Sequence, residues 1–500
     1  MEILSLLMHG FSVAFQPLNL FLVFLGAMLG TLFGALPGLG PINGVAILLP
    51  ITYTLGLPVE SSLIMLCGVY YGAEFGGMIS SILLNVPGDA GAVFTTLDGY
   101  PMAKNGFAGP ALAISGIASF IGGSIAVIGL TFFAPLLSSI AIHFGPAEYF
   151  VLMVFAFSTV SALMGSNPIK SLTGVIIGLL IAVVGVDSTT GILRFTFNEP
   201  ELYDGFEFLV VVVGFFAISE VMLMLEHHSS QHFSMPKVER VFVSLKEILY
   251  CKYAILRSSI IGFIVGVLPG TGASIASSVS YTIEQRLSDK EGTFGKGDIR
   301  GVAAPESANN ASAGGAIIPM LTLGVPGSGT TAVLLGALML YNINPGPTLF
   351  SEQPTLVWGL IASLYIGNIM LLVINLPMVR VFAKILQVPY WILVPSIIVL
   401  ALTGVYSVNT SSFALLLSII LGVFGFFLRK LNFSMATIIL GYILGGIMED
   451  SLRRAFAISG GEIDIFFKGE INLILWLLVA MVICTPFVAK IISKKYKLKR

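Results

Sequence analysis

Long apolar windows recur along the chain and predict most of its elements. The first runs from Ile3 to Val59 without Asp, Glu, Lys or Arg and is interrupted at 34–41. It is long enough for two bilayer crossings, since each needs about 20 apolar residues. Two polar stretches, 95–106 and 284–301, are predicted loops. Further apolar windows lie at 60–87, 110–137, 148–164, 171–186, 206–225, 258–281, 332–341, 356–379, 389–408, 413–427, 435–447 and 471–492.

This pattern predicts an all-α polytopic membrane protein with roughly 12 to 15 membrane segments, because hydropathy does not separate short hairpins from full crossings. Composition agrees with it. Of the 500 residues, 56% are hydrophobic and 10% are charged, whereas a soluble domain carries about 25% charged residues. The net charge of −1 gives no indication of nucleic-acid binding. The N-terminus lacks the basic region of a cleaved signal, so we interpret its apolar run as a mature span.

The segment from Pro305 to Thr331 combines apolar character with features that break a helix. Its sequence is PESANNASAGGAIIPMLTLGVPGSGTT, and no charged residue follows Glu306 until Glu352. Irregular backbone at membrane depth is tolerated only where protein or a watery cavity covers it. In secondary transporters, helices broken in this way bind substrate and coupling ions at their exposed ends. The segment is therefore predicted to form half of a transport site.

Two motifs of the chain occur twice, in the same order. GALPGLGP at 34–41 reappears as GVLPGTGA at 266–273, and GGMISSILLNVPGD from Gly76 matches GGAIIPMLTLGVPGS from Gly314. We therefore predict two membrane repeats, 1–225 and 258–500. An odd number of crossings between equivalent points predicts that the repeats are inverted relative to each other. Between them, 226–257 is a predicted cytoplasmic linker with an amphipathic segment, because basic residues mark the cytoplasmic side.

The breaks favour the binding of an anion together with a cation. A broken helix presents unpaired N–H groups at one new end, which suit a carboxylate, and unpaired C=O groups at the other, which suit a cation. Small polar side chains surround the breaks and are expected to line a pocket. They are Asn43, Asp89, Ser274, Asn309, Asn310, Ser328, Thr330 and Thr331, and the same breaks contribute Pro87, Gly88, Gly270 and Gly272.

Neither motif contains Lys or Arg, so we expect no side-chain cation beside a bound anion. Burying one carboxylate without compensation costs several kcal/mol. Backbone amides and hydroxyls can offset part of this cost, and a co-bound Na⁺ or proton the rest. Glu74, Asp89 and Glu306 are the candidate coupling-ion residues, because a carboxyl within a span indicates function. The alternatives are an interfacial or structural role for Glu74 and Glu306, and a turn residue for Asp89.

Other chemistries are less well supported by the sequence. His228 and His232 have the spacing of a metal-binding pair, but they lie in a polar linker without a second carboxylate, so we predict no metal site. Ser328 lies between two glycines with no His nearby in sequence to activate it. The phosphate-binding motif G-x-x-x-x-G-K-[ST] is missing, which argues against ATP-driven transport. We predict neither an enzyme nor a cofactor other than the coupling ion.

The motifs also carry a resemblance to a known family. GALPGLGPINGVAILLPITY, YYGAEFGGMISSILLNVPG, TTLDGYPMAKNGFAG, GILRFTF and GKGDIRGVAAPESANNASAGGAIIPMLTLGVPGS resemble the large membrane subunit of the tripartite tricarboxylate transporters, the TctA family. The resemblance implies a multi-pass permease of the prokaryotic inner membrane. It also implies two partners, a small four-span membrane subunit and an extracytoplasmic solute-binding protein that delivers a carboxylate. Uptake would be driven by an ion gradient and not by ATP.

The resemblance further implies positions that line the site. They are the LPGLG residues Leu36, Pro37, Gly38 and Gly40, the amides Asn309 and Asn310, and the PGS residues Pro326, Gly327 and Ser328. One departure is Asp89, where many members are expected to have a small or neutral polar residue. This departure indicates a different substrate or coupling ion and weakens an assignment to citrate.

The sequence therefore predicts a secondary active transporter, a symporter that imports a small organic di- or tricarboxylate with Na⁺ or H⁺. A passive anion channel and a non-transporting membrane scaffold are the alternatives, and a homo-oligomer is compatible with the sequence. The mechanism requires that the breaks at Pro37, Pro87, Pro269 and Pro326 face one polar chamber.

Overall fold

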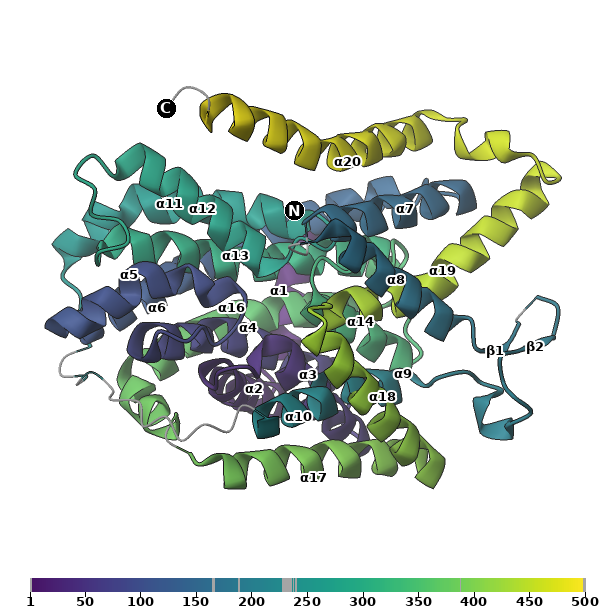
Figure 1. Cartoon of the computed structure of the whole chain (residues 1–500), viewed down its shortest axis with the longest axis horizontal. Coiled ribbons are helices and arrows are strands. Elements are labelled where there is room, and N and C mark those ends of the chain that lie inside the picture. Colours follow the sequence, from purple (N-terminus) through teal and green to yellow (C-terminus); the bar gives the residue numbers. More distant parts are fainter. Residues whose placement is uncertain are drawn as a thin grey trace.

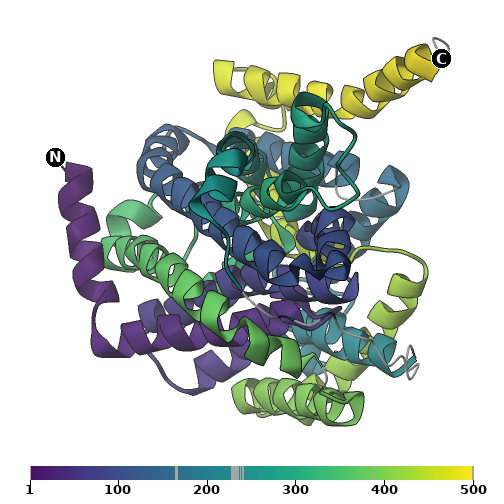
Figure 2. The same ribbon diagram turned by 90° about the vertical axis from the view of Figure 1, so that its left-hand side faces the viewer.

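The computed structural model describes residues 2–163, 167–187, 189–226, 236, 238, 241–386 and 388–497 (Figure 1). The linker residues His228 and His232 lie outside this part. Helices dominate the described residues, and the strands among them form one short antiparallel hairpin. The C-terminal helix α20 lies along one edge of the body in both views (Figures 1 and 2).

The elements up to residue 226 are α1 (Glu2–Ala14), α2 (Pro17–Ala35), α3 (Gly40–Thr54), α4 (Val59–Leu84), η1 (Gly91–Val93), α5 (Thr95–Met102), η2 (Ala103–Phe107), α6 (Ala108–Ala141), α7 (Pro146–Leu163), α8 (Pro168–Ala182), β1 (Gly185–Val186), β2 (Leu193–Arg194), η3 (Pro200–Leu202), α9 (Phe208–Val212), η4 (Val213–Ile218) and α10 (Ser219–Glu226). Those that follow are α11 (Leu245–Val267), α12 (Gly272–Ser288), α13 (Ile299–Leu323), α14 (Gly329–Leu340), α15 (Leu349–Glu352), α16 (Pro354–Ile385), α17 (Tyr390–Asn409), α18 (Ser412–Lys430), α19 (Met435–Ser459), η5 (Ile463–Phe466) and α20 (Glu470–Lys497).

Nine of the described helices are long and apolar enough to cross a membrane, and five shorter apolar helices accompany them. The prediction of an all-α polytopic membrane protein is therefore confirmed. The predicted loop at 95–106 is wrong, because this stretch forms α5 and η2 and continues into α6. The apolar window from Ile3 to Val59 forms three helices, α1 to α3, and not two.

The α2–α4 pair packs backbone against backbone through small residues. A Cβ atom added to Gly30 of α2 would overlap the carbonyl oxygen of Val69, and one added to Gly72 of α4 would overlap that of Ala27. Gly26, Gly34, Gly68 and Gly76 face the partner helix in the same way. Spacings of four residues between small side chains let membrane helices approach this closely. Dense contact here fixes the helix ends that precede the first and second breaks.

The second half of the chain repeats this succession of elements. A helix, a break, two helices and a second break occur as α2–α3–α4 and again as α11–α12–α13. Gly262 and Gly266 of α11 lie against the backbone of α13 as the α2 glycines lie against α4. Both α4 and α13 end in a left-handed residue, Asn85 and Gly324, followed by Val-Pro-Gly. The inversion of the repeats stays a prediction, as does the division at 225 and 257, and residue 257 lies within α11.

The buried carboxylate of Asp98 ties α5 to the loop before α13. Its Oδ1 accepts hydrogen bonds from the backbone N–H groups of Gly295, Gly297 and Asp298 at 2.9, 2.9 and 2.8 Å. Its Oδ2 accepts one from the hydroxyl of Tyr281 at 2.8 Å. Burial opposes ionisation of Asp298 in this loop, but hydrogen bonds from neighbouring side chains outweigh it and hold the pKa of that carboxyl below its ordinary value. The hydrogen bonds of Asp98 thus fix the loop before α13 to the first half of the chain.

The backbone contact between α2 and α4 predicts a sharp cost for one added methyl group. Gly30→Ala should destabilise the protein by about 1–3 kcal/mol, because neither backbone can move aside without strain. Gly446→Ala is the matched control, since Gly446 is also helical and a Cβ there would meet nothing within 4 Å. Thermal unfolding of both variants in detergent is the measurement. Equal melting temperatures would contradict the contact.

Candidate functional site

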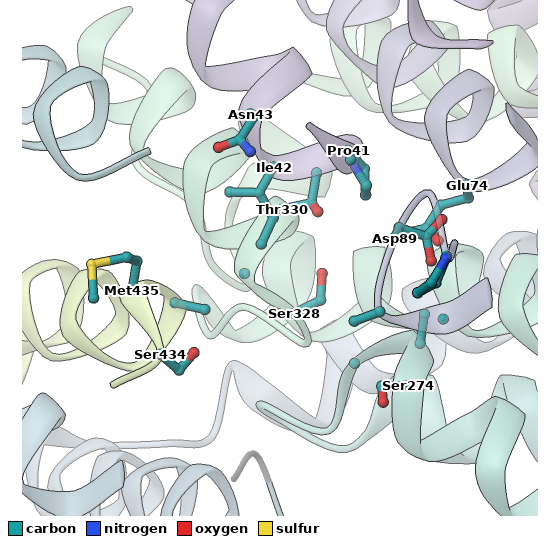
Figure 3. A pocket seen from close by; sticks show the side chains of 18 of the residues that line it. Pro41, Ile42, Asn43, Glu74, Asp89, Ser274, Ser328, Thr330, Ser434 and Met435 are labelled. Carbon is teal, nitrogen blue, oxygen red and sulfur yellow. The ribbon is translucent and has the colours of Figure 1, made fainter. Parts of the chain in front are cut away.

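A cavity of about 560 Å³ lies where the four breaks of the chain meet (Figure 3). Its wall includes 38–43 from the first break, 87–91 from the second, 271–275 from the third and 328–330 from the fourth. Residues 433–436, at the start of α19, complete this part of the wall. Segments far apart in sequence are thus brought to one chamber, of a size typical for small-molecule sites.

The repeated L-P-G-x-G sequence explains why the backbone turns in the same way at the first and third breaks. Proline cannot continue the hydrogen bonding of α2 or α11. The two glycines of each motif then adopt positive φ angles, +87° and +59° at Gly38 and Gly40, and +73° and +65° at Gly270 and Gly272. These angles favour glycine because it has no Cβ. Each break therefore ends one helix and starts the next within a few residues.

Four helices begin at the cavity, α3, α12, α14 and α19, and the first two residues of each belong to its wall. The first N–H groups of a helix have no partner within it, and its N-terminus carries a partial positive charge. Ser328 caps α14 by accepting a hydrogen bond from the N–H of Thr331. Among the described residues, α3, α12 and α19 have no side-chain cap. The wall is thus suited to an anion.

Two carboxyl groups also line the cavity, Glu74 of α4 and Asp89 of the second break. In Figure 3 they lie on one side, Ser434 and Met435 on the other, and Ser328 between them. Asp89 Oδ1 accepts a hydrogen bond from the N–H of Ala92 at 2.8 Å. Glu74 Oε2, Asp89 Oδ2 and Asn43 Oδ1 are buried and have no hydrogen-bond partner in the described part of the chain. Unpaired oxygens of this kind suit a hard cation or a proton.

The two amides of the central motif support the cavity from behind. The side-chain N–H of Asn309 donates to the backbone oxygen of Glu74 at 3.3 Å. The side-chain N–H of Asn310 donates to the backbone oxygen of Glu306 at 3.2 Å. The carboxyl of Glu306 is fully buried and accepts hydrogen bonds from Thr95 at 2.5 Å and Ser119 at 3.2 Å. Of these side chains, Asn309 bonds to a wall residue, Glu74, and positions its backbone.

The structure divides the predicted site residues into two groups. Those in the cavity wall are Gly38, Gly40, Asn43, Glu74, Pro87, Gly88, Asp89, Gly272, Ser274, Ser328 and Thr330. Those outside the wall are Leu36, Pro37, Gly270, Glu306, Asn309, Asn310, Pro326, Gly327 and Thr331. The second group ends helices, caps them or packs behind the wall. Its direct contact with substrate stays a prediction, as does the coupling-ion role of Glu306.

The expectation of a cavity without a side-chain cation is wrong, because Arg429 belongs to its wall. Its guanidinium Nη1 lies 2.5 Å from Glu220 Oε2. In the sequence Arg429 follows an apolar window and is indistinguishable from an interfacial anchor. It lies outside both repeated motifs, so the search for breaks could not find it. The wall residues Phe216, Phe433, Met435 and Ala436 were missed for the same reason.

Comparison with known proteins gives a consistent result. A sequence model described as the tripartite tricarboxylate transporter TctA family matches residues 20–440. An uncharacterized 52.8 kDa protein in the TAR-I ttuC' 3' region of Agrobacterium vitis is 42% identical over 471 residues, 94% of this chain and 93% of the relative. An uncharacterized protein in the TAR-II ttuC' 3' region of the same organism is 43% identical over 210 residues, 42% of this chain and 87% of the relative. No solved structure matches the chain.

The cavity predicts which positions a water-soluble thiol reagent reaches. In a background with Cys484→Ser, which removes the exposed thiol, Ser274→Cys should react rapidly because Ser274 belongs to the wall. Ser277→Cys, one turn further along α12, should react much more slowly because Ser277 is fully buried. Labelling rates in detergent measure the difference. Equal labelling rates would contradict the placement of Ser274 in the cavity wall and of Ser277 behind it.

Proposed function

Because the chain belongs to the tripartite tricarboxylate transporter TctA family, a family of transporter components and not of enzymes, we propose that it is the permease subunit for a small organic anion. The anion would bind in the cavity where the four breaks meet and cross the membrane together with a coupling cation. The resemblance to the family favours a di- or tricarboxylate as this anion.

The observation that carries this proposal is the convergence of four helix N-termini on one chamber. Backbone N–H groups bind carboxylates without the desolvation cost of additional buried ionic side chains. A site of this type lies at membrane depth in several secondary transporter folds, where broken helices of two repeats supply it. Binding in a cavity lined by helices of both halves of the chain is compatible with carriage of an anion across a bilayer.

The carboxyls of Glu74 and Asp89 support coupling to an ion gradient. When both are ionised they repel a bound anion, and when a cation or proton neutralises them they no longer do. Occupation by Na⁺ or H⁺ would therefore strengthen anion binding, which is the thermodynamic basis of symport. Na⁺ and H⁺ are both compatible with the unpaired oxygens of these groups.

The family also supports the cellular setting of the proposed transporter. Members are components of tripartite systems, so we propose a second, smaller membrane subunit and an extracytoplasmic binding protein as partners. The membrane would be the inner membrane of a prokaryote. A passive anion channel is the second candidate, since helix N-termini can also line a pore. A scaffold without a transport role would not account for the convergence of four helix N-termini on one cavity.

Transport measurements separate a symporter from a channel. Proteoliposomes that contain the chain and its two partners should accumulate labelled succinate or citrate above the outside concentration under an imposed Na⁺ or proton gradient. An ionophore that collapses the gradient should abolish this accumulation. Uptake that equilibrates but never exceeds the outside concentration would indicate a channel.

The same assay tests the coupling role of the cavity carboxyls. Asp89→Asn should reduce gradient-driven accumulation to background, because the amide holds neither a proton nor the charge that attracts a cation. Asp450→Asn is the matched control, since Asp450 is exposed in the second half of α19. Full accumulation by Asp89→Asn would exclude Asp89 from coupling.

A further inference from the structure

The guanidinium of Arg429 lies at the wall of the cavity, and not all of its N–H donors have a partner in the described residues. Arginine offers five N–H donors in a planar fork. In the described part of the chain, Nη1 contacts Glu220, Nη2 lies 3.4 Å from the backbone oxygen of Phe215, and Nε is buried with no partner. A buried guanidinium with an unpaired N–H is costly unless a ligand completes it. The Nε atom itself is buried, but the Arg429 side chain is 20% exposed in the cavity wall, which leaves room for a second carboxylate at the guanidinium.

Glu220 of α10 fixes this guanidinium against the first break. Its Oε2 is 2.5 Å from Arg429 Nη1, and the carboxyl is 9% exposed. Its Oε1 lies so close to Gly38 that an added Cβ there would approach within 2.9 Å. The ion pair is thus held beside the backbone turn that starts α3, one of the helices whose N-terminus faces the cavity. Arg429 and the anion-binding backbone share one chamber.

We propose that Arg429 binds one carboxylate of the substrate while the helix N-termini bind another, and that Glu220 is an internal competitor for the same guanidinium. This inference rests on the proposed function and adds to it the basis of selectivity. A substrate with two carboxylates can bind both Arg429 and the helix N-termini, whereas a monocarboxylate can bind only one of them. A charge-assisted hydrogen bond from the guanidinium to the second carboxylate supplies the preference.

The competition separates this role from that of a structural ion pair. A structural pair stabilises the fold through both partners, so removing either charge harms the protein in the same direction. A competitor acts in the opposite direction from the group for which it competes. Neutralising Glu220 leaves Arg429 free for the substrate, whereas neutralising Arg429 removes a binding point. The two substitutions should therefore shift dicarboxylate affinity in opposite directions.

The experiment measures protection of Ser274→Cys from the thiol reagent by succinate and by butyrate, which have the same number of carbons but two carboxylates and one. The purified full chain carries Cys484→Ser as above. In this parent succinate should protect at a lower concentration than butyrate. Arg429→Gln should weaken protection by succinate on the order of tenfold, the loss of one charge-assisted hydrogen bond, and leave protection by butyrate unchanged. Glu220→Gln should strengthen protection by succinate.

Two further variants control for folding and for general charge. Glu220→Gln combined with Arg429→Gln removes both charges of the pair and should still lack the preference for succinate. Lys430→Gln removes the neighbouring exposed pair of α18 and α10, in which Lys430 lies 2.5 Å from Glu226. Lys430 does not belong to the cavity wall, so this variant should keep the parent preference.

The proposal is overturned if succinate and butyrate protect the parent equally, if Arg429→Gln keeps the parent preference, or if Glu220→Gln weakens protection by succinate as Arg429→Gln does. Failure of the proposed function would be seen in a different experiment, as a lack of gradient-driven accumulation in proteoliposomes. A protein that accumulates carboxylates while Arg429→Gln keeps the parent preference would retain the function and lose this inference.

Discussion

Backbone that leaves its helix at membrane depth needs cover from protein, and the rest of this structure follows from that need. An unpaired N–H or C=O group in hydrocarbon costs several kcal/mol, and in the described part of the chain four breaks meet at the cavity. Two of them follow helices that are pressed backbone to backbone on a neighbour, α2 on α4 and α11 on α13. The remaining two end α4 and α13 themselves. The glycine-rich contacts thus hold the same helices whose ends are broken.

A chamber of this kind is stable only if its wall does not move independently in each half of the chain. Asp98 supplies one connection, since it accepts three backbone N–H groups from the loop that starts α13. Glu306 supplies another from within α13, through hydroxyls of α5 and α6. Both carboxyls are fully buried and hydrogen-bonded, which is the condition under which a buried acid is tolerated. These two buried carboxyls therefore hold the two halves of the chain together around the cavity.

The sequence predicted the parts of this arrangement that local chemistry determines. The L-P-G-x-G and Val-Pro-Gly motifs located the breaks because Pro and Gly act on their own backbone. It did not predict that 95–106 is helical, because the polar side chain of Asp98 finds its partners in residues almost two hundred positions away. Nor did it predict Arg429, whose place in the wall depends on how α18 packs against η4 and α10. Contacts between distant segments decide both cases, and hydropathy carries no record of them.

For the proposed anion and cation, electrostatics across the cavity would decide whether they bind separately or together. A sphere of the cavity's volume is about 10 Å across, so charges on opposite walls remain within interaction range, and two unit charges about 8 Å apart repel by about 2 kcal/mol at an effective dielectric constant near 20. Ionised Glu74 and Asp89 would each oppose an anion by an amount of this order, comparable with what a helix N-terminus contributes. The Arg429–Glu220 pair is neutral as a whole and does not relieve this repulsion. A cation or proton at the two carboxyls does relieve it, and by reciprocity the anion favours the cation to the same degree. Coupling can therefore arise from the charge balance of one chamber, before any helix moves.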